Sequence, residues 1–86
     1  MDEFIDLKNL MEQIEAIVVE EQATRVLKVC VRLGPLSHLD HEHFLQRFRL
    51  LAHGTAAQEA EVETVITNDL SNPDAHRVLL ETIEVD

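Results

Sequence analysis

Histidines and carboxylates lie close together in a short stretch of this 86-residue chain. The chain has five histidines, which are His38, His41, His43, His53 and His76. Three of them surround Asp40, and imidazole and carboxylate groups are both metal donors. On a helix, His41 and His43 would point to different sides, so they could not easily share one ion, whereas His38 and Asp40 precede the helix and could. The alternative is a solvated loop in which Asp40 only caps the helix.

Few other chemistries fit the residue types. No nucleophile-and-base set, glycine-rich phosphate loop or paired-cysteine motif occurs in the chain. Cys30 is the only cysteine, which excludes an intramolecular disulfide and a cysteine-based zinc site, and we expect it to be an inert strand residue. A small enzyme that uses Asp40 with a nearby histidine is the weakest of the functions considered.

The charge balance narrows the classes of partner. Seven Lys and Arg residues against 17 Asp and Glu residues give a net charge of −10, which repels nucleic acid and anionic membranes and favours basic partners or cations. No apolar run reaches the roughly 18 residues of a membrane span, and the acidic N-terminus does not resemble a signal peptide. The sequence therefore predicts a single cytoplasmic domain over residues 1–86, with no nucleic-acid or membrane partner.

Hydrophobic periodicity predicts five elements in the order helix, strand, helix, strand, strand. Their ranges are 2–21, 25–33, 40–52, 60–66 and 77–85, with a polar turn over 67–76. Asp40 suits the N-cap of the second helix, and Gly54 suits a left-handed position after its last turn. The fold class is α/β, with both helices packed on one face of a three-stranded sheet.

Alternation predicts which side chains face the helices. In the first strand these are Leu27, Val29, Val31 and Leu33. The last two strands are expected to pair antiparallel through the 67–76 turn, with a bulge near Glu81 and Thr82 that reconciles two parities in the last strand. The open face would then show Val26, Cys30, Val65, Val78 and Leu80. That set is either a candidate interface or scattered exposed apolar residues.

One ordered series of residues resembles a known family. It consists of Gly34, Leu36, Ser37, Leu39, Asp40, Glu42, Phe48, Leu51, Gly54, Thr55, Ala60, Glu61, Val62 and Glu63. With the Met1-Asp2-Glu3-Phe4 start and the Ile83–Asp86 end, this series resembles the HypA/HybF nickel-delivery chaperones of nickel–iron hydrogenase maturation. The resemblance covers nearly the whole chain.

The resemblance implies a ligand set for nickel. The matching positions are the amine of Met1, Asp2, Glu3 and Asp40, with the starts of the two helices side by side. Met1 is expected to be retained, because the initiator methionine is normally removed only before small residues. Asp2 stands where the family has His, which replaces a nitrogen donor with an oxygen. His38 or His41 could supply the imidazole instead.

The resemblance also implies a function and its partners. The chain would be a cytoplasmic accessory protein, not an enzyme, that delivers nickel during hydrogenase maturation. The family's zinc domain, with its paired cysteines, is replaced here by the turn over 67–76, so no zinc is expected. The alternative is a metal-free adaptor that docks on a hydrogenase large subunit or a maturation GTPase. A homodimer is also among the expected assemblies.

Overall fold

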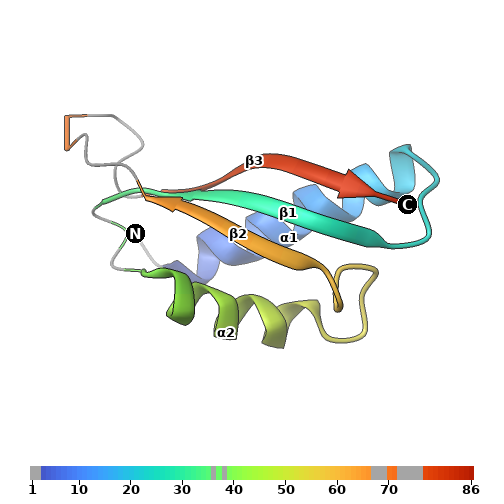
Figure 1. The fold of residues 1–86 in the computed structure, drawn as a ribbon, viewed down its shortest axis with the longest axis horizontal. Helices are drawn as coiled ribbons and strands as arrows, with labels where there is room; N and C mark the ends of the chain where they lie inside the picture. The colour runs from blue at the N-terminus through green and yellow to red at the C-terminus, as the bar shows by residue number, and fades with distance from the viewer. Residues whose placement is uncertain (1–2, 36, 38, 67–69, 72–76) are drawn as a thin grey trace.

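The computed structural model describes residues 3–35, 37, 39–66, 70–71 and 77–86, and of residues 3–6 only the backbone. It contains two helices and three strands in the predicted order, so the predicted fold class is confirmed. They are α1 (Glu3–Glu20), β1 (Val26–Leu33), α2 (His41–Ala52), β2 (Glu61–Ile66) and β3 (Val78–Val85). Figure 1 shows α1 behind the sheet and α2 beside β2. The predicted turn over 67–76 lies mostly outside the described residues.

The sheet order is β2-β1-β3, which corrects one prediction. The strands β2 and β3 do not pair with each other, because β1 lies between them, parallel to β2 and antiparallel to β3. The physical reason is burial. The central strand is covered on both edges and carries Val29, Val31 and Leu33, all fully buried, whereas β2 carries Glu61 and Glu63 and tolerates an edge.

One hydrophobic core holds the helices against the sheet. It joins Leu7, Leu10, Met11 and Ile14 of α1, Phe44, Phe48 and Ala52 of α2, and the inward residues of β1. The rings of Phe44 and Phe48 lie 5.8 Å apart between centroids. Since residues of both helices share this core with Val29, Val31 and Leu33, both helices cover the same face of the sheet.

Two irregularities set which strand residues face the core. A register shift between Val26 and Lys28 places Val26 in the core, 2% exposed, and leaves Leu27 43% exposed. The prediction that Leu27 points inward and Val26 outward is therefore wrong, because a bulge reverses the alternation there. A second shift lies opposite Glu81, where the predicted bulge is confirmed.

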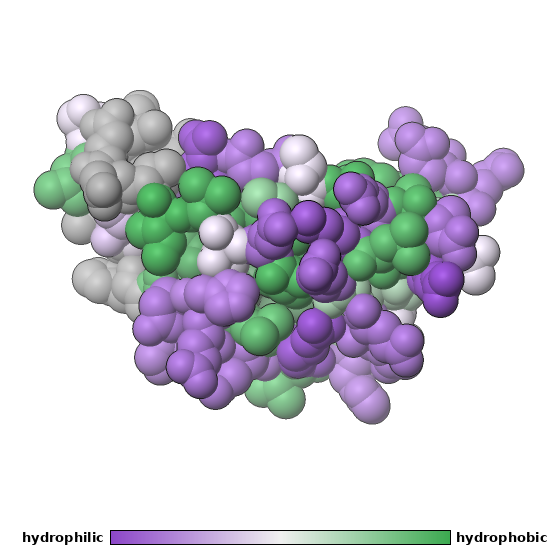
Figure 2. Space-filling model, in the orientation of Figure 1, coloured by the Kyte–Doolittle hydropathy of each residue, from purple (hydrophilic) through white to green (hydrophobic). Residues whose placement is uncertain are grey.

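This second bulge also corrects the predicted open face. Val78 is 6% exposed and belongs to the core, and Leu80 packs against it. Of the residues expected on the open face, Val65 is 45% exposed and Cys30 is half-buried. Figure 2 looks onto this face and shows apolar and hydrophilic side chains interleaved across it. Among the described helices, neither is long and apolar enough to cross a membrane.

Candidate functional site at the start of the helices

A short turn leads from β1 to α2. The Ser37 N–H donates to the Gly34 carbonyl at 3.0 Å, and Pro35 occupies the second position of this turn, where its fixed φ is favourable. Ser37 is buried, and its hydroxyl accepts a bond of 3.4 Å from the Leu39 N–H. Leu39 is itself 7% exposed, so the turn is anchored in the core immediately before Asp40.

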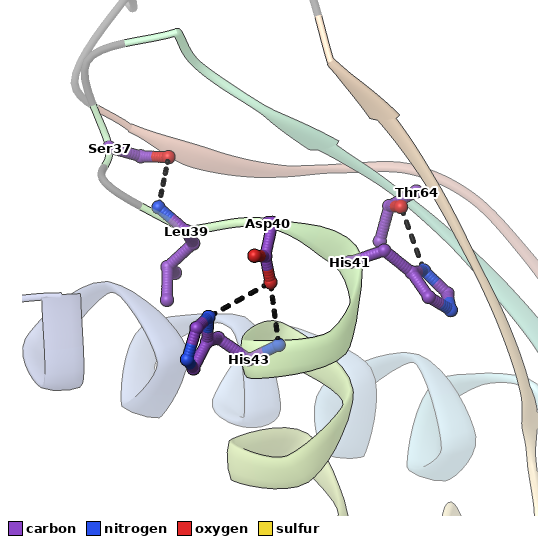
Figure 3. Close-up of polar contacts among 6 residues, drawn as sticks. All are labelled: Ser37, Leu39, Asp40, His41, His43 and Thr64. Carbon is purple, nitrogen blue, oxygen red and sulfur yellow. Dashed lines mark hydrogen bonds and ion pairs between the residues drawn. The ribbon is translucent and has the colours of Figure 1, made fainter.

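Asp40 caps α2, as predicted. Its backbone is extended, and its Oδ1 accepts the His43 N–H at 2.8 Å. The same Oδ1 lies 3.0 Å from the His43 Nδ1 (Figure 3). The bond from the His43 N–H, supported by the nearby charge of the His43 ring, lowers the pKa of the Asp40 carboxyl below its ordinary 3.8. Asp40 is therefore an exposed, ionised carboxylate held in one orientation at a helix start.

His41 and His43 point in different directions, as the helical spacing predicts (Figure 3). The His41 Nδ1 lies 2.9 Å from the hydroxyl of Thr64 in β2, whereas the His43 ring lies against Asp40. The structure therefore brings Asp40 together with His43, not with His41. Sequence reasoning missed both the Asp40–His43 ring contact and Thr64. The i, i+3 spacing could have indicated the first, but only the tertiary fold places Thr64 beside α2.

The structure describes little of the remaining predicted ligands. Met1, Asp2 and His38 lie outside them, and Glu3 opens α1 with only its backbone described. The helices α1 and α2 contact each other, and Figures 1 and 3 show that both begin at the same end of the molecule. Among the described residues, no group of three or more His, Cys, Asp or Glu side chains could hold a metal ion.

The opposite end of the helix layer is closed by backbone turns. Two residues after the end of α1, Gln22 has a left-handed conformation (φ 55°). The Gln22 N–H donates to the Val19 carbonyl and the Ala23 N–H to the Val18 carbonyl. After α2, Gly54 has the predicted positive φ, 81°. It does so as the third residue of a type II turn, closed by the Thr55 N–H on the Ala52 carbonyl at 2.9 Å.

Comparison with known proteins now defines the class of protein. The family described as "Hydrogenase/urease nickel incorporation, metallochaperone, hypA" matches residues 1–70 of the 86. This fold and family define a nickel metallochaperone rather than an enzyme. The chain belongs to the HypA family, as the sequence resemblance indicated, and the family description adds urease to hydrogenase as a destination of the nickel.

Solved structures share the fold. The solution structure of the nickel metallochaperone HypA from Helicobacter pylori matches with a TM-score of 0.77 and 17% identity, over 99% of this chain and 97% of that chain. A second solution structure, of a HypA protein, matches with a TM-score of 0.69 and 17% identity, over 92% and 91% of the two chains. At this identity they support the fold alone. No curated protein matches in sequence.

Proposed function

We propose that this chain carries nickel at the end of the molecule where α1 and α2 begin. The ligands are the amine of Met1, the carboxylates of Asp2, Glu3 and Asp40, and an imidazole. The single observation that supports this set most directly is Asp40, an ionised carboxylate before the first residue of α2, at the end of the molecule where α1 also begins (Figure 1). Its two hydrogen bonds with His43 both use Oδ1, and a carboxylate has a second oxygen that can bind a cation.

The imidazole comes from the residues next to Asp40. His38 precedes Asp40 by two residues and replaces the nitrogen donor that Asp2 does not supply. His41 is the second candidate, but its ring bonds Thr64 and points away from Asp40 (Figure 3). His43 does not bind the metal in this scheme. Its ring orients Asp40 through Oδ1, the role that outer-shell partners have at metal sites.

The protein works without zinc in this proposal. Its sequence has one cysteine, Cys30, which lies half-buried in β1, and the segment over 67–76 contains no other. A structural zinc site normally takes four ligands, largely cysteines. Nickel is therefore the cargo and the only metal required. Its destination is a hydrogenase or urease subunit, reached directly or through a maturation GTPase, in the cytoplasm.

A nickel titration with matched variants tests the ligand set. Asp40→Asn keeps an N-cap but loses the anionic oxygen, so we expect nickel affinity to fall by about tenfold or more, while helicity is retained. Glu42→Gln removes a carboxylate two residues away and is the control, with affinity unchanged within about twofold. Calorimetry supplies the affinities, and isotope-edited NMR follows the amides of residues 2, 3 and 40. Equal affinities for the two variants, or no amide response below millimolar nickel, would show that the ligand set is wrong.

Histidine variants separate specific from adventitious binding. His38→Ala should weaken nickel binding more than His41→Ala, and His53→Ala should not change it. His53 follows the last residue of α2, about 20 Å from Asp40 at 1.5 Å per residue. A loss confined to His53→Ala would indicate adventitious nickel on the surface.

The metal-free adaptor remains the alternative function. Asp2 in the position of the family's histidine is the observation that favours it, because nickel prefers an imidazole to a carboxylate. Pull-down of a hydrogenase subunit or maturation GTPase, with and without a chelator, separates the two functions. Capture that a chelator leaves unchanged, together with no nickel affinity, would establish the adaptor.

A further inference from the structure

The outer side of α2 carries an apolar and cationic strip that the core does not use. Five residues line a shallow hollow there, with a volume of about 570 Å³, and we call them the outer α2 strip: Leu45, Gln46, Arg49, Leu50 and His53. Leu50 is 79% exposed, more than any other large hydrophobic residue in the described part of the chain. The strip lies toward the end of α2 that is remote from Asp40.

Burial on the inner side does not explain the leucines of this strip. The inner side of α2 is completed by Phe44, Phe48 and Ala52, which are fully buried. A helix with apolar residues on both sides is typical of one that is covered on both sides. The inner side is covered by this chain's own core, whereas on the outer side no described residue buries Leu50.

The spacing of the strip fits a helix. Leu45, Arg49 and His53 follow one i, i+4 row, and Gln46 and Leu50 follow the neighbouring row. Two such rows enclose a groove into which a ridge of side chains from a second helix can pack. Such a groove is inclined by about 26° to the helix axis, so a partner helix would cross α2 at about 50° or about 20°, depending on which of its own ridges packs there.

The charge of the strip differs from that of the rest of the molecule. In β1, Lys28 pairs with Glu61 and Glu63, and Arg32 pairs with Glu81. The Arg49 guanidinium instead donates to the Gln58 carbonyl at 3.1 Å, and no carboxylate of the described residues lies within ion-pair distance of it. A chain of net charge −10 thus has, within its described part, a cation without an ion-pair partner next to Leu50, the most exposed of the described leucines.

We infer that the outer α2 strip docks an amphipathic helix of a partner protein, with apolar side chains that cover Leu45 and Leu50 and carboxylates that face Arg49. Charge complementarity selects an acidic helix, because a basic one would meet the Arg49 guanidinium while the apolar contacts stayed the same. This surface is separate from the proposed nickel end, so a docked partner leaves the metal ligands open.

Binding of two designed peptides tests this inference. Both are helical, with leucine at an i, i+3, i+4, i+7 spacing, and they carry either glutamate or lysine at the flanking positions. Fluorescence anisotropy should show that the glutamate peptide binds at least about tenfold more tightly than the lysine peptide, against the net charge of the protein. Amide shifts should be confined to residues 45–53. Preference for the lysine peptide, or shifts elsewhere, would overturn the assignment.

Matched variants locate the surface. Leu50→Glu and Arg49→Glu should each abolish binding of the glutamate peptide. Val19→Glu is the control, since Val19 on α1 is 76% exposed and its substitution should leave binding unchanged. Equal losses for Leu50→Glu and Val19→Glu would contradict a specific site. Nickel affinity is measured on the same variants and should not change, which keeps this test separate from that of the metal site.

Sedimentation equilibrium examines the competing occupant. If the unmodified protein is a dimer that Leu50→Glu converts to a monomer, a second copy covers the strip and the partner-helix assignment is wrong.

Discussion

The two helices run in the same direction on one face of the sheet, yet they differ in what they expose (Figure 1). α1 buries one strip, Leu7, Leu10, Met11 and Ile14, and its described outer side is mainly polar. α2 buries Phe44, Phe48 and Ala52, begins at an exposed carboxylate and has a second apolar side. The side chains of α1 thus contribute mainly to the core, whereas α2 also exposes an ionised carboxylate at its start and a leucine on its outer side, the two features on which the proposals above rest.

The largest expected effect separates the two sides of α2. Phe48 is fully buried, so Phe48→Ala should lower the free energy of unfolding by about 3–5 kcal/mol through lost burial and a cavity. Leu50→Ala, on the outer side, should change it by less than about 0.5 kcal/mol. Urea denaturation monitored by circular dichroism gives both values. A comparable loss for the two variants would show that the outer leucine supports the fold, and the contrast between the sides would fail.

The second effect compares the ends of the two helices. Gly54 has φ 81°, and a Cβ there would meet nothing within 4 Å, so Gly54→Ala should cost about 1 kcal/mol through backbone strain alone. Gln22 has φ 55°, so Gln22→Gly should stabilise the protein by up to about 1 kcal/mol. Thermal unfolding of both variants checks the opposite signs. If both variants raise or both lower the melting temperature, the positive φ does not determine stability in the same way in the two turns.

A smaller effect concerns the start of α2. Asp40→Ala removes the acceptor for the His43 N–H and should destabilise the protein, while Asp40→Asn should retain most of the stability, because asparagine also caps helices. Urea denaturation in the presence of a chelator measures the contribution of the cap to stability without any contribution from bound metal. If both variants are as stable as the unmodified protein, the cap contributes little to stability.

The smallest expected effect is the pH dependence of the same group. The folded state lowers the pKa of the Asp40 carboxyl below 3.8, so the unfolded state binds its proton first. The stabilisation is fully present above that value and is lost as the pH falls through the folded pKa. Asp40→Asn should therefore flatten the acid limb of the stability curve below about pH 4. An unchanged limb would mean that other carboxylates account for it.

The sequence by itself determined the five elements, their order, the N-cap of α2 at Asp40 and the positive φ of Gly54 after α2. It did so because hydrophobic spacing, the cap at Asp40 and the positive φ at Gly54 depend on neighbours along the chain. The same locality allowed the bulge at Glu81 to be predicted from a change of parity.

Only the tertiary structure decided the strand order, the inward position of Val26 and the partners of the histidines. The strand β1 is central, and its side chains Val29, Val31 and Leu33 are buried against residues of both helices, which are distant in the sequence. The alternating residues around Leu27 do not indicate the bulge there. Thr64 contacts His41 only after β2 has paired with β1. Pairing between distant segments depends on the packing of the whole domain, and for that reason the sequence could suggest candidate site residues such as Asp40 but not their geometry.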